Sequence, residues 1–268
     1  MIFHPVAHDR TARAVERQIE TLVLEGVLRA GERLPGERDL ARALDVSRPI
    51  VREALAALEQ RRLLTSRHGG GTFVADVTGT VFAAPVASLI ANDAKARADY
   101  LEYRREIEGL TARLAAERAT AADRALLEAT LDEMRQAHRD ADAEREATLD
   151  VEFHSAVGEC AHNIVLLHTL RACYRLLSDD VFFNRALLYR RDGMRDRLLE
   201  QHEAIHAAIM RGDAIGAERA AHQHIDFIER ETKAMERDGE RTAIAKIRLE
   251  QRTGSSGTPA RRRSGAQA

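Results

Sequence analysis

Residues 47–74 read SRPIVREALAALEQRRLLTSRHGGGTFV and change from a helical pattern to a strand pattern within a few positions. In the first half, apolar residues recur at the three- and four-residue spacing of one helix face. LLTSRH and GTFV are short strand-like runs, and the glycines at their junction supply the positive φ that a tight hairpin turn needs. The stretch therefore predicts a helix that leads directly into a two-stranded hairpin.

Two further helical patterns come before this stretch. Residues 10–28 carry an apolar stripe that ends near two glycines, and LPGERDLARAL gives a shorter helix with Gly36 as its N-cap. The next helix begins at Ser47, whose hydroxyl can cap it, and it tolerates Pro49 because first-turn N–H groups have no intrahelical partner. Three short helices and a two-stranded ribbon are the layout of a winged helix-turn-helix, which we place at residues 8–76.

Positive charge gathers in the same stretch although the whole chain has a net charge of −2. Residues 48–68 hold five arginines and one histidine against two glutamates, and Arg48 and Arg52 lie one turn apart on the exposed side of the third helix. The solvated face of an amphipathic helix would explain an arginine pair alone. The glycine-rich wing that follows favours nucleic acid, with the helix in the major groove and both arginines near base edges or phosphates.

The segment LRAGERLPGERDLARALDVSRPIVREALAALEQRRLLTSRHGGGTFV resembles the DNA-binding domain of the GntR family of bacterial transcriptional regulators over nearly its whole length. The resemblance implies a double-stranded DNA operator as partner. It implies operator contacts from the following residues: Arg38, Arg48, Arg52, His68 and Gly69. Two positions depart from the family pattern, since Gly36 stands where serine is frequent and Gly70 stands where many members carry arginine.

The rest of the chain is helical in pattern, so the predicted fold class is mostly α. Residues 77–96 are rich in small residues and predict a linker with one short helix, VASLIAN. Residues 97–238 show helix after helix and predict an all-helical bundle, with Thr120 and Asp123 as a capping box. Residues 239–268 end in a Gly, Ser and Arg segment, which predicts a flexible basic tail.

Other features narrow the class of protein. The longest apolar runs are only a few residues, and the N-terminus lacks the apolar core of a signal peptide, so we expect a cytoplasmic protein without a membrane partner. Cys160 and Cys173 show neither metal-site nor disulfide spacing.

Four polar residues lie on apolar helix faces within the predicted bundle. Asp150 and His154 are one turn apart beside Leu149, Phe153 and Val157. His202 shares a stripe with leucine and isoleucine, and periodicity turns His224 inward but His222 toward solvent.

Burying a carboxylate and three imidazoles costs free energy unless these groups have polar partners. One divalent transition metal such as Zn²⁺ could be bound by all four side chains at once. The alternative, a hydrogen-bonded core histidine, is better for any one of them alone. Four together on three helices favour the metal, with His206 as a weaker candidate ligand.

The family resemblance extends to this region. LEYRREIEGLTARLAAERA, DVEFHSAVGECAHN and QHEAIHAAIMRGD resemble the effector-binding helical domain of the fatty-acid-regulator (FCD) subgroup. There, Asp150, His154, His202 and His224 fall on metal-ligand positions, and Arg104 falls on a position that binds an effector carboxylate. AHNIVLLHTLR, LLYRR and KIRLEQR are similar to the branch of pyruvate dehydrogenase complex, glycolate and lactate regulators, which implies pyruvate, lactate or glycolate as effector.

We therefore expect a metabolite-responsive transcriptional regulator, a repressor, that acts as a homodimer on a pseudo-palindromic operator, because one winged helix reads only a half-site. A helical metalloenzyme fused to a DNA-binding domain is the alternative from another class. The sequence shows no nucleophile with an oriented base and no nucleotide loop, which disfavours it. A nucleoid-type binder would show little sequence preference and no effector response.

Overall fold

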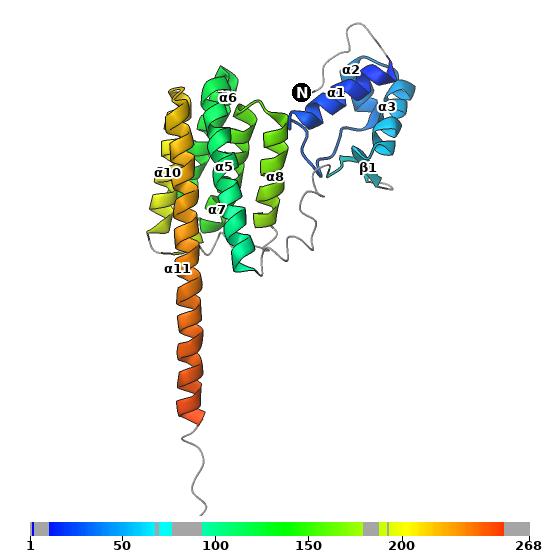
Figure 1. Ribbon diagram of the computed structural model, residues 1–268. Coiled ribbons are helices and arrows are strands. Elements are labelled where there is room, and N and C mark those ends of the chain that lie inside the picture. The colour runs from blue at the N-terminus through cyan, green and yellow to red at the C-terminus, as the bar shows by residue number, and fades with distance from the viewer. Residues whose placement is uncertain are drawn as a thin grey trace, which may run out of the picture. The chain divides into compact units, whose positions relative to one another are not determined.

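The computed structural model describes residue 2 and residues 11–67, 70–76, 93–178, 188–191 and 193–254 (Figure 1). His68 and Gly69, which were predicted to contact DNA, lie outside the described residues. The predicted linker lies outside them from residue 77 to residue 92, as does the tail from residue 255.

The N-terminal part is a three-helix unit followed by a hairpin, in the predicted order. Its elements are α1 (Ala12–Leu24), α2 (Glu37–Leu44), α3 (Arg48–Gln60), β1 (Leu64–Arg67) and β2 (Gly71–Val74). The two strands are antiparallel, with Leu64 opposite Val74 and Arg67 opposite Gly71. One apolar core joins the helices to the hairpin, so the winged helix-turn-helix prediction is confirmed.

Local signals explain where these helices begin and end. The Thr11 side chain accepts a hydrogen bond from the Ala14 N–H at the start of α1, and Asp45 ends α2 in the left-handed conformation. Ser47 is the N-cap residue of α3, but its hydroxyl makes no capping hydrogen bond, so that detail of the prediction was wrong. Gly36 is the N-cap residue of α2, as predicted.

The hairpin is anchored to the loop between α1 and α2. Arg33 forms an antiparallel bridge with Phe73, and the Leu34 N–H donates to the Thr72 carbonyl over 2.9 Å. The Val74 N–H donates to the Glu32 carbonyl over 2.9 Å. β2 therefore has backbone partners on both sides, β1 on one and residues 31–34 on the other.

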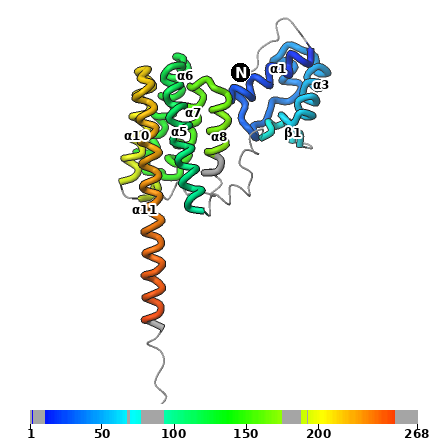
Figure 2. The backbone as a smooth tube through the Cα atoms, in the orientation of Figure 1, coloured from blue at the N-terminus to red at the C-terminus, as the bar shows by residue number. Residues whose placement is uncertain are grey.

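The remaining helices form the predicted bundle (Figures 1 and 2). They are α5 (Ala94–Arg118), α6 (Ala121–Arg139), α7 (Ala143–Cys160), α8 (Ile164–Ser178), α10 (Met194–Met210) and α11 (Ala214–Gly254). Leu127, Leu131, Leu149, Phe153 and Ile209 are among the buried side chains of their common core. None of the helices among the described residues is long and apolar enough to cross a membrane.

The helix boundaries test several predictions. The capping box of Thr120 and Asp123 is present at the start of α6. α5 begins at Ala94, where the Asp93 side chain caps it, rather than at residue 97. The flexible tail predicted from residue 239 was wrong in its first part, because α11 continues to Gly254. Good helix formers and the pair Arg241 with Asp238 sustain these turns although their side chains are exposed.

Candidate metal centre and nucleic-acid interface

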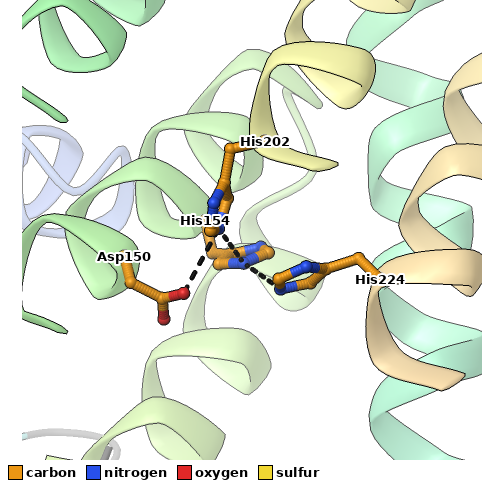
Figure 3. A group of neighbouring side chains, drawn as sticks. All are labelled: Asp150, His154, His202 and His224. Carbon is orange, nitrogen blue, oxygen red and sulfur yellow. Dashed lines mark hydrogen bonds and ion pairs between the residues drawn. The ribbon is translucent and has the colours of Figure 1, made fainter. Parts of the chain in front are cut away.

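Four side chains from three helices meet inside the bundle, and they are the four that the sequence selected (Figure 3). Asp150 and His154 come from α7, His202 from α10 and His224 from α11. All four are buried, and one potential ligand atom from each lies within 4.8 Å of the others. Their helices hold them rigidly because the neighbouring turns carry the apolar core.

The ring nitrogens of the three histidines converge (Figure 3). His154 Nε2 lies 3.2 Å from His224 Nε2 and 3.3 Å from His202 Nε2. His202 Nε2 lies 3.2 Å from Asp150 Oδ1, which also accepts a hydrogen bond from the Tyr189 hydroxyl over 3.2 Å. A carboxylate oxygen and three imidazole nitrogens thus point at one small volume.

Oxygen atoms outside this group lie next to the Nδ1 atoms of two of the rings. His154 Nδ1 lies 3.0 Å from Glu108 Oε2, and His224 Nδ1 lies 2.9 Å from Gln201 Oε1. When each Nδ1 donates its proton to these acceptors, the Nε2 atoms of both neutral rings carry lone pairs. Two lone pairs that face each other over 3.2 Å repel unless a cation lies near them. The residues present therefore fit a bound divalent transition metal, for which imidazole and carboxylate are suitable donors.

Arg104 lies beside this group in a buried ion pair with Glu108. The two residues are one turn apart on α5, and their side chains are 1% and 4% exposed. Arg104 Nε donates to Glu108 Oε1 over 2.8 Å, Nη2 lies 2.7 Å from the same oxygen, and Nη2 donates to the Tyr174 hydroxyl over 3.2 Å. The Glu108 carboxylate therefore joins Arg104 to His154.

The charges in this pair stabilise each other. Burial alone would raise the pKa of Glu108, but Arg104 and His154 hold it far below its ordinary value. Burial opposes the charged form of Arg104 as well and is the largest single influence on it. Glu108, Tyr174 and Tyr100 together outweigh burial, so the pKa of the guanidinium lies well above its ordinary value. Both groups remain ionised inside the bundle.

Sequence reasoning missed Glu108, Gln201 and Tyr189. The four-residue spacing from Arg104 to Glu108 was a signal that could have found the ion pair, since it places both on one helix face. Gln201 and Tyr189 gave no such signal, because their contacts depend on how the helices pack.

A small cavity lies against this cluster. Its lining includes Glu108, Thr111, His154, Leu170 and Ile205. Its volume of about 10 Å³ is room for a single water molecule. A larger ligand must therefore displace side chains in order to enter.

His206 and His222, which lie near the cluster in the sequence, do not contribute to it. His206 Nε2 lies 3.1 Å from Glu128 Oε2 on α6, so this weaker candidate is turned away from the other ligands. The prediction that His222 faces solvent was wrong, because its ring is half-buried against α5. A Cβ atom at Gly109 would lie 2.1 Å from His222 Nε2, so glycine provides the space for the ring.

The predicted DNA-contacting arginines of the described residues lie on the two helices before the wing. Arg38 on α2 and Arg48 and Arg52 on α3 are all exposed. Arg52 donates two hydrogen bonds to Glu37, and Arg48 Nη2 lies 3.7 Å from the same carboxylate. These bonds lower the pKa of Glu37, with Arg52 as the largest cause. The structure brings Arg48 and Arg52 together at one acid, with Arg38 next to it in the sequence.

Comparison with known proteins places both parts of the chain. Residues 11–74 match the family model "Bacterial regulatory proteins, gntR family", and residues 99–227 match the FCD domain. The proposed L-lactate dehydrogenase operon regulatory protein of Escherichia coli (strain K12) is 39% identical over 242 residues, covering 87% of this chain and 91% of that protein. The Glc operon transcriptional activator of the same strain is 30% identical over 239 residues, covering 88% and 94%.

Solved structures agree with this fold. The GntR protein of Streptococcus agalactiae aligns with a TM-score of 0.50 and 27% identity, covering 82% of this chain and 99% of that chain. The family and the named relatives are transcriptional regulators, which contradicts the alternative of a metalloenzyme fused to a DNA-binding domain. The chain belongs to the gntR family of bacterial regulatory proteins, carries an FCD domain, and is a DNA-binding transcriptional regulator.

Proposed function

We propose that this regulator senses a small 2-hydroxy or 2-oxo acid through a metal-containing site in its helical domain and releases its operator when the acid binds. The active form is a homodimer in the cytoplasm that represses its target genes. Each protomer reads one half-site of a pseudo-palindromic operator, because the symmetry of a dimer matches that of such a sequence.

The convergence of the three Nε2 atoms and the Asp150 carboxylate supports the metal part of the proposal. Glu108 and Gln201 orient two of the rings so that their Nε2 lone pairs face inward. A divalent transition metal, with Zn²⁺ as the first candidate, would supply a cationic centre that attracts the carboxylate and neighbouring oxygen of an acid.

Arg104 supports a carboxylate as the ligand. Its guanidinium is fully charged inside the bundle and lies in contact with Tyr174 and Glu108, next to the cluster. A buried guanidinium is suited to forked hydrogen bonds with a carboxylate. The cavity between Glu108 and His154 favours a ligand of few atoms over a fatty acyl chain. L-Lactate ranks first because the relative at 39% identity is named for an L-lactate dehydrogenase operon.

The acid can change DNA binding only if it binds one conformation of the protein more tightly than another. The ligands lie on α7, α10 and α11, so occupation of the site changes how these helices pack. An acid that binds the released arrangement more tightly shifts the dimer away from the operator spacing, whereas equal affinity for both arrangements shifts nothing.

The test combines operator binding with removal of the metal. The purified protein is titrated onto a fluorescent duplex from its own upstream region, and L-lactate, pyruvate and glycolate are then added separately. We expect at least one acid to release the duplex and to raise the thermal unfolding midpoint, and a chelator to abolish both effects. A metal-free protein that responds fully to the acid would contradict the metal role. A protein that responds to none of the acids would contradict the proposed effector class.

A further inference from the structure

The ion pair of Arg104 and Glu108 raises a question about access to the guanidinium. Carboxylates bind arginine most strongly through two parallel N–H bonds, along either the Nε and Nη2 edge or the Nη1 and Nη2 edge. Both edges contain Nη2. In this structure Nη2 lies 2.7 Å from Glu108 Oε1, which accepts a hydrogen bond from Nε, and Nη2 donates to the Tyr174 hydroxyl over 3.2 Å. An incoming carboxylate must therefore take Nη2 from one of these two residues.

Glu108 is the partner that opposes the acid. It carries the same charge as the incoming carboxylate, and two carboxylates in one buried site repel. Its side chain is 4% exposed, so little water screens that repulsion. Tyr174 is neutral and is not repelled in this way. Glu108 also lines the cavity, which in this arrangement has room for only about one water molecule.

We infer that Glu108 is an internal competitor of the effector: its carboxylate occupies the Arg104 guanidinium in the acid-free protein, and the acid binds by displacing it. This inference rests on the proposed function and adds a residue that sets its affinity. The second oxygen of Glu108 stays with His154 Nδ1, from which it is 3.0 Å away. Acid binding is thus linked, through one side chain, to the orientation of a cluster histidine.

The decisive variant is Glu108→Gln. The amide oxygen keeps an acceptor for His154 Nδ1, but the charge that holds Arg104 is lost. We expect L-lactate to bind the metal-loaded variant about tenfold more tightly than wild type, because a charge-assisted competitor has been removed. Calorimetry gives the affinity, and elemental analysis of the same samples gives the metal content, which should stay at the wild-type ratio.

The chain offers a matched control. Glu146 is 5% exposed in its side chain and contacts an arginine and a histidine in the same way, since Oε2 lies 2.6 Å from Arg195 Nε and Oε1 lies 2.9 Å from His138 Nδ1. Glu146 does not line the cavity. Glu146→Gln should therefore lower the thermal unfolding midpoint to a similar extent and leave the affinity for L-lactate unchanged.

The outcomes separate this inference from the proposed function. If a folded, metal-loaded Glu108→Gln protein binds L-lactate as tightly as wild type or more weakly, the competitor role is overturned. Loss of the metal from this variant overturns it as well, because Glu108 would then only support His154. If Glu108→Gln does not fold, Glu108→Asp is the second variant, because it keeps the negative charge but shortens the side chain. Tighter binding of L-lactate is again expected, and unchanged binding would contradict the inference. Failure of both wild type and variants to bind L-lactate, pyruvate or glycolate overturns the proposed function and this inference together.

Discussion

Arg52 on α3 and Glu37 on α2 form a two-point ion pair, in which Nε and Nη2 of the arginine lie 3.3 and 2.9 Å from the two carboxylate oxygens. The pair fixes the plane of an exposed guanidinium at the face of the helix that we expect to enter the major groove. A side chain oriented before binding loses less conformational freedom on contact with DNA.

The first prediction concerns Arg52→Ala. If Arg52 contacts a base edge, its loss should weaken operator binding by about 1–3 kcal/mol and relax the sequence preference, whereas a phosphate contact would weaken all duplexes alike and reduce the salt dependence. Binding to operator and scrambled duplexes over a salt series separates the two cases. Arg42→Ala is the control, because Arg42 is an exposed α2 arginine paired with Asp39 and outside the predicted contact set. Unchanged affinity for both duplexes would remove Arg52 from the interface.

The second prediction concerns the metal. His202→Ala should abolish stoichiometric metal binding, and in wild type a chelator should lower the thermal unfolding midpoint, because a ligand that binds only the folded state stabilises it by mass action. His206→Ala is the matched control, since His206 is one turn away and buried but contacts Glu128 instead of the cluster. Equal metal loss in both variants would indicate a general disturbance of α10 and argue against a specific ligand role for His202.

The third prediction concerns the capping box of α6. Burial alone would raise the pKa of Asp123, but hydrogen bonds from Thr120 and the contact with His162 outweigh it and lower that pKa. Because the pKa of Asp123 is lower in the folded protein than in the unfolded chain, its ionised carboxylate stabilises the fold at every pH above the unfolded-state pKa. This stability is lost as the pH falls through the folded-state pKa. Asp123→Asn should therefore cost about 1 kcal/mol at neutral pH.

Thermal unfolding of wild type and Asp123→Asn between pH 8 and pH 3 checks this expectation. The difference should be constant down to about pH 5 and shrink below about pH 4, where the carboxyl becomes protonated in the unfolded chain and then in the folded protein. Asp140→Asn at the other end of α6 should show no such loss, because a negative charge is unfavourable at a helix C-terminus. A difference that persisted at low pH would assign the effect to packing.

The fourth prediction concerns the thiols. Burial raises the pKa of Cys160 and of Cys173 to about 12, and both side chains are almost completely inaccessible. Because the thiolate is the reactive form, neither cysteine should react with iodoacetamide in the native protein at pH 8, and both should react in denaturant. Intact mass measurement distinguishes zero from two additions. Rapid native labelling would show that the bundle opens around α7 or α8.

Helical periodicity was enough to select the cluster. Asp150, His154, His202 and His224 each lie on an apolar stripe, and the stripe of a bundle helix faces the core. The same rule failed for His222, because a glycine on α5 leaves room for a ring at the edge of the interface. Periodicity gives the direction of a side chain from its own helix, but it contains no information about the shape of the opposite helix.

The partner of Arg104 could not be derived in the same way. A carboxylic effector was implied for Arg104 from family resemblance, yet Glu108 already occupies the guanidinium in the fold. The end of the last helix was also placed too early, since a terminal Gly, Ser and Arg segment indicated a tail from residue 239 whereas α11 continues through Gly239 to Gly254. A single glycine costs only about 1 kcal/mol in a helix, which surrounding helix formers and ion pairs offset.

The backbone around the wing leaves little opportunity for unwanted strand pairing. An exposed strand with unpaired N–H and C=O groups is a template for aggregation. Residues 31–34 cover one side of β2, and on β1 the Ser66 N–H donates to the Glu59 carboxylate over 2.8 Å, which places a negative charge at the outer edge of the ribbon. Neighbouring molecules of this DNA-binding protein therefore find little free strand edge at which their ribbons could join.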